Sequence, residues 1–408
     1  FYSACLEMMS EKNVTSLQFF PPGLVQSCIE YCMKNTKKHA LAQIAFNLSP
    51  ACYDLDKLIR SLNALGLFEV LVFMWNSVFK DYITPLVDMI NAISDESPSF
   101  VLFANASPEA IKIMVFPYLS YLMRGKVYPL EKHTTNEAQS AQIKKALLEF
   151  VFSAAVFTWP EHSTTKIRTV KMAEQEPAFP YFRLLLAYDC NQCLSWLDQC
   201  FQDSFFNTNH SDQTSDKVFA VNRQYIIDLL LDIIRNDSDG FLSQKDTKLI
   251  VIFIVRSYFT YEQFVFLSTK AVNTVFKFLC QDSLWKHFSE ISMKQLVKDK
   301  RIRFPFAKYR DLLLKNKFYD TLTEIYFEEN NFLEGLAIVF NFHLQRKNLC
   351  TLFNQALNYY KNDVIGLNDL EILLKDNFEV LVNAAPGQTA QIVNENFPDC
   401  LLYTSPSP

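Results

Sequence analysis

Glycine is scarce in this sequence, with only 7 glycines among 408 residues. Nucleotide-cradling loops and the tight turns of β-sandwiches depend on glycine, because it adopts positive φ angles without strain. Strand-like alternation of apolar and polar residues is also missing along the chain. These two absences predict an all-α protein.

Long apolar runs are missing as well. The strongest one, from Leu249 to Val255, ends at Arg256, whereas a membrane-spanning helix needs about 20 apolar residues. Any membrane association is therefore expected to be peripheral. The chain opens FYSACLEMM, without an initiator methionine or a signal peptide, and we expect it to be an internal fragment.

The sequence contains no P-loop, nucleophile elbow or HExxH pattern, and its six histidines are scattered. We therefore predict a protein that is not an enzyme and binds no cofactor. An all-α enzyme stays an alternative, because catalytic residues distant in sequence can converge in a fold. The net charge of −5 disfavours a general nucleic-acid binder.

The 10 cysteines lie mostly within apolar helical stripes, which favours a reduced cytoplasmic compartment over a disulfide scaffold. Cys190, Cys193 and Cys200, followed by His210, could be read as a metal site. On one helix, however, Cys190 and Cys200 would lie about 15 Å apart, while zinc holds each sulfur at about 2.3 Å. We predict buried thiols and no metal site.

Asp237, Asp239 and Gly240 resemble part of a calcium-binding loop. With Gly240 at the sixth position, Arg235 would occupy the first and Asp246 the twelfth. A cation at position one and no glutamate at position twelve contradict the motif. We predict a polar turn instead.

Half of the residues are hydrophobic, and 37 are phenylalanine. The segment 55–90 arranges such residues as a helix, a turn at Gly66, a second helix and a connector. Thr84 is then expected to cap a third helix, with Pro85 at its first position. The second helix carries Phe73, Met74, Trp75 and Phe79, whose spacing is typical of a core. A groove for a partner helix is the alternative.

The same unit returns about 250 residues later, at 309–342. A helix pair that recurs with its apolar positions in register is typical of an α-solenoid, in which each hairpin buries its faces against its neighbours. We predict an all-α solenoid of stacked antiparallel helix pairs, with clathrin- or TPR-like repeats, over residues 1–399. The expected pairs are Leu62 with Leu312, Phe68 with Phe318, Val72 with Leu322, Trp75 with Ile325, Tyr82 with Phe332, Leu86 with Leu336 and Ile90 with Phe340.

Three stretches receive separate expectations. A helix is predicted from Ile143 to Trp159, and irregular excursions are predicted at 161–177 and 202–217. The final residues 400–408, CLLYTSPSP, match the translation of a transposon-based sequencing adapter. We exclude this tail from the fold, with a genuine tail as the alternative.

Four stretches together resemble the vacuolar protein sorting-associated protein 8 family. The most specific piece is the spacing N-x-x-x-x-D-Y-x-x-P, formed by Asn76, Asp81, Tyr82 and Pro85 beside Trp75. The stretches are WNSVFKDYITPLVDMI at 75–90, PYLSYLMRGKVYP at 117–129, FPYFRLLLAYDCNQCLSWLDQCFQD at 179–203 and NRQYIIDLLLDII at 222–234.

The resemblance implies a non-enzymatic scaffold of the CORVET endosomal tethering complex, in which core vacuolar sorting subunits are the partners. It also implies that early-endosomal Rab GTPases bind the full-length protein, and that the protein lies peripherally on the cytoplasmic side of endosome or vacuole membranes. A clathrin-like coat chain or a lysosomal tethering subunit is the alternative. The signature residues either satisfy backbone groups at helix ends or form a surface corner that a partner reads.

A basic run formed by Lys298, Lys300, Arg301 and Arg303 is the remaining candidate. It could contact an acidic headgroup or an acidic partner protein. The alternative is a solvated helix end beside Pro305.

Overall fold

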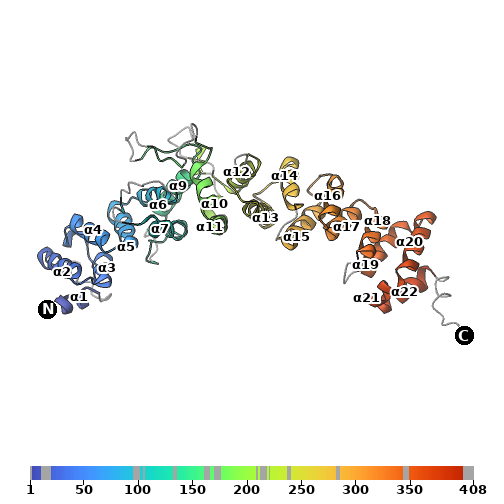
Figure 1. The fold of residues 1–408 in the computed structure, drawn as a ribbon, viewed down its shortest axis with the longest axis horizontal. Coiled ribbons are helices and arrows are strands. Elements are labelled where there is room, and N and C mark those ends of the chain that lie inside the picture. The colour runs from blue at the N-terminus through green and yellow to red at the C-terminus, as the bar shows by residue number, and fades with distance from the viewer. Residues whose placement is uncertain are drawn as a thin grey trace. The chain divides into compact units, whose positions relative to one another are not determined.

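The computed structural model describes most of the chain as α-helix (Figure 1). The described residues divide into two compact units. One comprises residues 1–229 and 237–242, and the other comprises residues 230–236 and 243–408. The structure describes residues 2–10, 20–94, 102–103, 106–131, 136–159, 166–169, 176–207, 210–211, 218–219, 221–236, 240–281, 285–342 and 349–397.

Among the described residues of the first unit there are eleven complete α-helices and the beginning of a twelfth. Helix α12 (Arg223–Arg235) runs from this unit into the second. The complete helices are α1 (Tyr2–Ser10), α2 (Pro22–Lys34), α3 (Lys38–Asn47), α4 (Leu55–Ala64), α5 (Phe68–Met74), α6 (Thr84–Ile93), α7 (Pro108–Lys112), α8 (Val115–Met123), α9 (Glu137–Val151), α10 (Pro180–Tyr188) and α11 (Cys190–Gln202).

In the second unit, the helices pack mainly against their next or next-but-one neighbour in sequence. This nearest-neighbour pattern is the mark of an α-solenoid, and the predicted fold class is confirmed. The helices are α13 (Gln244–Thr260), α14 (Thr269–Leu279), α15 (Lys286–Lys298), α16 (Arg310–Lys315), α17 (Tyr319–Glu328), α18 (Phe332–Asn341), α19 (Leu349–Tyr360), α20 (Val364–Asp376), α21 (Phe378–Ala384) and α22 (Pro386–Asn396).

Among the described residues of both units, the same turn ends five helices, α2, α4, α8, α16 and α17. One residue adopts positive φ, its N–H donates to the carbonyl three residues back, and the next N–H donates to the carbonyl five back, at 2.8 to 3.3 Å. This is the Schellman motif, which satisfies carbonyls that a helix end leaves unpaired. Four of these turns connect consecutive helices directly, and because the connection is so short, the helices it joins run antiparallel. The turn at Gly125 is instead followed by a longer segment before α9. The positive-φ residues are Thr36, Gly66, Gly125, Lys317 and Asn330.

The internal repeat is present, but its predicted register is wrong by one residue in the first helix and in α5. The predicted pairs of Phe68 with Phe318, Val72 with Leu322 and Trp75 with Ile325 are therefore each displaced by one residue. Leu71 and Met74 correspond to Leu322 and Ile325, and all four are buried. Leu62 corresponds to Leu313 rather than Leu312, because each accepts the last hydrogen bond of its turn and both are fully buried. The positive-φ residues Gly66 and Lys317 are accordingly 251 positions apart.

A π-helical turn, Trp75–Phe79, absorbs the difference in register. In a π-helix each N–H bonds five residues back, so one turn holds an extra residue. Beyond it, Lys80 and Asn330 both have positive φ and lie 250 positions apart. The corresponding positions of α6 and α18, such as Leu86 and Leu336, are fully buried in both copies. The first copy therefore differs from the second by one inserted residue, which lies in the segment that begins with Trp75.

The predicted helix from Ile143 to Trp159 is wrong at its end, because α9 stops at Val151. Beyond it, the N–H of Phe157 donates to the hydroxyl of Tyr181 at 2.7 Å, and Thr158 forms an isolated bridge with Lys166. Tertiary hydrogen bonds thus hold the backbone of this segment in place of a helical ladder. Phe152 is buried, whereas Ala154, Ala155 and Phe157 are exposed.

Parts of both predicted excursions are described. In the first, Glu176 accepts hydrogen bonds from the N–H and hydroxyl of Thr169. In the second, β1 (His210–Ser211) pairs antiparallel with β2 (Val218–Phe219). Before β1, a short 3-10 helix, Ser204–Asn207, follows α11. The tail 400–408, residues 161–165 and 170–175 of the first excursion, and residues 208, 209 and 212–217 of the second lie outside the described part of the chain.

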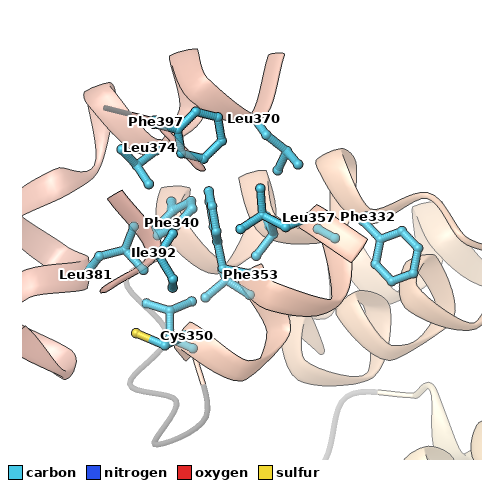
Figure 2. Close-up of a cluster of buried hydrophobic side chains, with 14 of the residues drawn as sticks. Phe332, Phe340, Cys350, Phe353, Leu357, Leu370, Leu374, Leu381, Ile392 and Phe397 are labelled. Carbon is cyan, nitrogen blue, oxygen red and sulfur yellow. The ribbon is translucent and has the colours of Figure 1, made fainter. Parts of the chain in front are cut away.

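One apolar cluster illustrates how the second unit is held together (Figure 2). Phe353 of α19 is fully buried, and residues of α18, α20, α21 and α22 pack around it. Burying one such side chain contributes roughly 1.5–3 kcal/mol. The side chains that enclose Phe353 therefore come from more than one hairpin.

The two positive-φ positions of the repeat predict opposite effects on stability. Lys317→Gly should raise the free energy of unfolding by about 1 kcal/mol, because glycine adopts φ of 60° without the strain of a Cβ. Gly66→Ala should lower the free energy of unfolding by a similar amount, because alanine is strained at the φ of 70° that Gly66 adopts. A clash adds nothing to this cost, since the new Cβ would make only an ordinary contact with Phe68. Thermal and urea unfolding followed by circular dichroism measures both, and shifts of the same sign would refute the equivalence of the two turns.

Candidate functional site

Four of the signature residues lie between the end of α5 and the start of α6. Trp75 and Asn76 lie in the π-helical turn, and Asp81 and Tyr82 lie in the connector. Pro85 is buried at the second position of α6. Asn76 is also buried, while Trp75, Asp81 and Tyr82 are half-buried. We call this cluster the Asp81 corner, together with Thr84, Tyr118 and Trp159, which contact it.

The carboxylate of Asp81 organises the corner. Its Oδ1 accepts hydrogen bonds from the N–H groups of Ile83 at 2.9 Å and Thr84 at 3.0 Å. Its Oδ2 accepts from Trp75 Nε1 at 3.1 Å and from the hydroxyl of Thr84 at 2.5 Å. Asp81 therefore caps α6, because it satisfies N–H groups that the first turn leaves unpaired.

The expected capping role of Thr84 is wrong. Thr84 is the first residue of α6, so Pro85 occupies the second helical position instead of the first. The Thr84 hydroxyl instead accepts a hydrogen bond from Trp159 Nε1 at 3.2 Å. The segment that follows α9 is thereby tied to the start of α6.

Tyr118 of α8 closes the corner from the other side. Its hydroxyl lies 3.1 Å from Asn76 Oδ1 and 2.9 Å from the carbonyl oxygen of Tyr82, and these two acceptors share its single hydrogen. Burial raises the pKa of Tyr118 well above its ordinary value, so the hydroxyl stays a donor. The stretch 117–129 resembled the family, but the role of Tyr118 was missed. A polar atom on a buried aromatic residue was the available signal.

Both oxygens of the Asp81 carboxylate accept hydrogen bonds from donors of the chain itself, so Asp81 is arranged to hold structure rather than to accept a substrate proton. The side that faces solvent carries Phe79, which is 47% exposed, and Lys80. Of the stripe predicted to be core, Met74 is buried and Phe73 and Trp75 are half-buried. Phe79 departs from that prediction, because the π-helical turn rotates it outward.

A second buried carboxylate was missed by the sequence analysis. Asp88 of α6 is fully buried and accepts the N–H of Leu102 at 2.6 Å. Asn63 of α4 donates to the carbonyl of the same Leu102 at 3.1 Å. These two side chains fix the backbone that follows α6. The signal was a lone acid within the apolar run Leu86–Ile90.

Two of the four cations of the basic run, Lys298 and Arg301, pair with neighbouring acids. Arg301 pairs with Asp299 at 2.7 Å and Glu262 at 3.0 Å, and its guanidinium lies 5.0 Å from the ring centre of Tyr258. Its hydrogen bond holds the pKa of Asp299 below the usual range.

Lys298 pairs with Glu324 at 3.1 Å. Lys300 and Arg303 are exposed. Of the four predicted cations, these two are left to present their charge to solvent.

The cysteines of α11 are buried thiols, as predicted. Burial raises the pKa values of Cys193 and Cys200 well above the ordinary thiol range. Burial likewise raises the pKa of Cys28 to about 11 and that of Cys280 to about 12. Among the described residues, no group of three or more His, Cys, Asp or Glu side chains could hold a metal ion.

Two other sequence candidates fall partly outside the described part of the chain. The side chain of His210 lies outside the described part, and so do Asp237 and Asp239. Gly240 is described and has a φ of 62°. A membrane span was also sought: within the described ranges, none of the helices combines the length and apolar character needed to cross a bilayer.

Comparison with known proteins matches the chain to one family. The family model described as "Vps8 central TPR" matches residues 2–201. Vacuolar protein sorting-associated protein 8 of Saccharomyces cerevisiae is 28% identical over 410 residues, which cover 98% of this chain and 30% of the yeast protein. The homologues of Mus musculus and Homo sapiens are 21% and 20% identical, over 96% of this chain and 26% of each protein. The chain thus spans less than a third of the length of these curated relatives.

Replacing Asp81 should cost more stability than replacing an ordinary helix-capping residue. Asp81→Ala should lower the free energy of unfolding by about 3 kcal/mol, because four donors lose a charged acceptor. Asp54→Ala is the matched control, since Asp54 caps α4 through one bond to the N–H of Lys57 and should cost about 1 kcal/mol. Urea unfolding of the two variants measures the difference, and equal losses would contradict the assigned role of Asp81.

Thiol reactivity tests the burial of the cysteines. In a Cys400→Ser chain, the nine described free cysteines are all buried and should react with Ellman's reagent at pH 8 at least a hundredfold more slowly than in urea. The reason is that raised pKa values and burial both suppress the attacking thiolate. A fast-reacting thiol in the native chain would show that at least one cysteine is open to solvent.

Proposed function

Because this chain belongs to the Vps8 family, a family of vacuolar protein sorting proteins, we propose that it is a non-enzymatic scaffold segment of a CORVET-like endosomal tethering complex. The observation that carries the proposal is the family match, which spans a stack of helix pairs. In such a stack, each layer keeps a fixed relation to the layers beside it, and the outer edges of the helices stay open to partners.

The mechanism we propose is geometric. Apolar side chains hold successive hairpins together, and the polar groups of the Asp81 corner are used to fix the angle at which one hairpin meets the next. Core vacuolar sorting subunits would dock on the exposed edges. A Rab GTPase would bind through the full-length protein, and attachment to endosome or vacuole membranes would be peripheral.

The solvent-facing side of the Asp81 corner is our candidate contact for a neighbouring subunit. Phe79 offers an exposed ring, and Lys80 offers a charge next to it. Aromatic residues are enriched at protein interfaces, which makes the Phe79 ring the main element of this candidate contact. Lys300 and Arg303 of the second unit are a further candidate contact, for an acidic partner or headgroup.

Co-purification tests the scaffold proposal. The chain should be retained by core vacuolar sorting subunits from the same source, and the double variant Phe79→Ser, Lys80→Glu should reduce retention at least fivefold. Neither residue takes part in the hydrogen bonds of Asp81, so the fold should persist in circular dichroism. Lys361→Glu, an exposed change elsewhere, is the matched control.

Two results would count against the proposal. If the core vacuolar sorting subunits did not retain the unmodified chain, that result would contradict the scaffold role itself. Unchanged binding by the double variant would remove the Asp81 corner as the contact.

A further inference from the structure

A groove in the second unit has no role in the scaffold described so far. Its volume is about 810 Å³, and α15, α17 and α19 form its walls, together with the turn between α17 and α18. A volume of this size accommodates several side chains of a bound segment. We call it the α17 groove.

The central wall carries a row of carboxylates. Asp320, Glu324 and Glu328 follow one another at intervals of four residues on α17, so they lie on one face of the helix. Phe327 lies beside Glu328 on the same face and is half-buried.

The α15 wall compensates two of these three charges. Lys294 pairs with Asp320 at 3.6 Å, and Lys298 pairs with Glu324 at 3.1 Å. Glu328 is exposed and takes part in none of the ion pairs that the described residues form. The groove therefore has a net negative charge, concentrated at the end where Glu328 lies.

The opposite wall is uncharged. Helix α19 contributes Thr351, Leu352 and Gln355. Leu352 and Phe327 are both half-buried, and Phe332 packs edge-to-face on Phe327 with ring centres 5.1 Å apart. Phe332 lies at the margin of the apolar cluster (Figure 2), so these rings rest on a packed base.

An apolar strip therefore lies beside an uncompensated carboxylate. We propose that the α17 groove binds a short segment of a partner protein in which one bulky apolar side chain is flanked by lysine or arginine. The apolar side chain would contact Phe327, Phe332 and Leu352, and a flanking cation would pair with Glu328. Phosphate-bearing ligands such as nucleic acids or anionic lipids do not fit, because the carboxylates repel them.

This inference goes beyond the proposed function, since it concerns a different surface and does not depend on any tethering subunit. Its test needs only the full chain. A phage-displayed library of random 12-residue peptides would be depleted on the Glu328→Lys variant and then panned on the unmodified chain. Peptides that need Glu328 survive this procedure.

The expected survivors contain Phe, Leu, Ile, Met or Trp with at least two neighbouring Lys or Arg residues. By fluorescence anisotropy, they should bind the unmodified chain at least tenfold more tightly than Glu328→Lys. Glu379→Lys makes the same charge change at an exposed site on α21 and should leave the affinity within twofold. Leu352→Asp should also weaken binding at least tenfold, and circular dichroism verifies the fold of each variant.

Several results would overturn the proposal. One is that no peptide survives, and another is that the survivors lack basic residues. Equal affinity for the unmodified chain and the Glu328→Lys variant would also refute it. If sedimentation shows a dimer that Glu328→Lys dissociates, the occupant is a second copy of this chain rather than a partner segment.

Discussion

Burial of apolar surface between successive hairpins is the constraint on which the rest of this structure depends. Each helix carries one apolar stripe, and a pair of helices leaves part of its stripe open until the next pair covers it. The cluster around Phe353 shows the consequence, since five helices from α18 to α22 contribute to it. Stability is therefore a property of neighbours along the stack.

Polar side chains serve the same stacking at the places where helices end. The Schellman turns satisfy backbone groups without side chains, and Asp81 does so with a carboxylate that also holds Trp75. The corner coincides with the π-helical turn, where the first copy of the repeat holds one residue more than the second. An inserted residue would loosen a helix end unless new bonds fixed it. The bonds to Asp81 and Tyr118 supply that fixation.

Much of the fold could be predicted from the sequence, because scarce glycine and helical apolar spacing are strong signals of stacked helices. Leu62, Leu86 and Phe318 were recognised as repeat positions, and all three are buried. The register error arose because periodicity alone does not reveal a π-helical turn. An insertion of one residue inside a helix leaves the apolar pattern on both sides intact.

The site was harder to predict, since its contacts join residues far apart in sequence. The family signature named Asn76, but its partner Tyr118 lies 42 residues away. Trp159, which donates to the hydroxyl of Thr84, lies 75 residues from that partner. Thr84 looked like a cap because its position fits, whereas Asp81 has a carboxylate within reach of two N–H groups. The α17 groove gave no signal at all, because Glu328 and Leu352 meet only in the fold.

Hydrogen–deuterium exchange of a Phe353→Ala variant tests the central claim most directly, since it reports how far the loss of one buried ring is felt along the stack. The account predicts faster exchange in α18 to α22 and unchanged exchange in α2 to α5, because each hairpin depends on its neighbours. Uniformly faster exchange along the whole chain would show a single cooperative core and would contradict it.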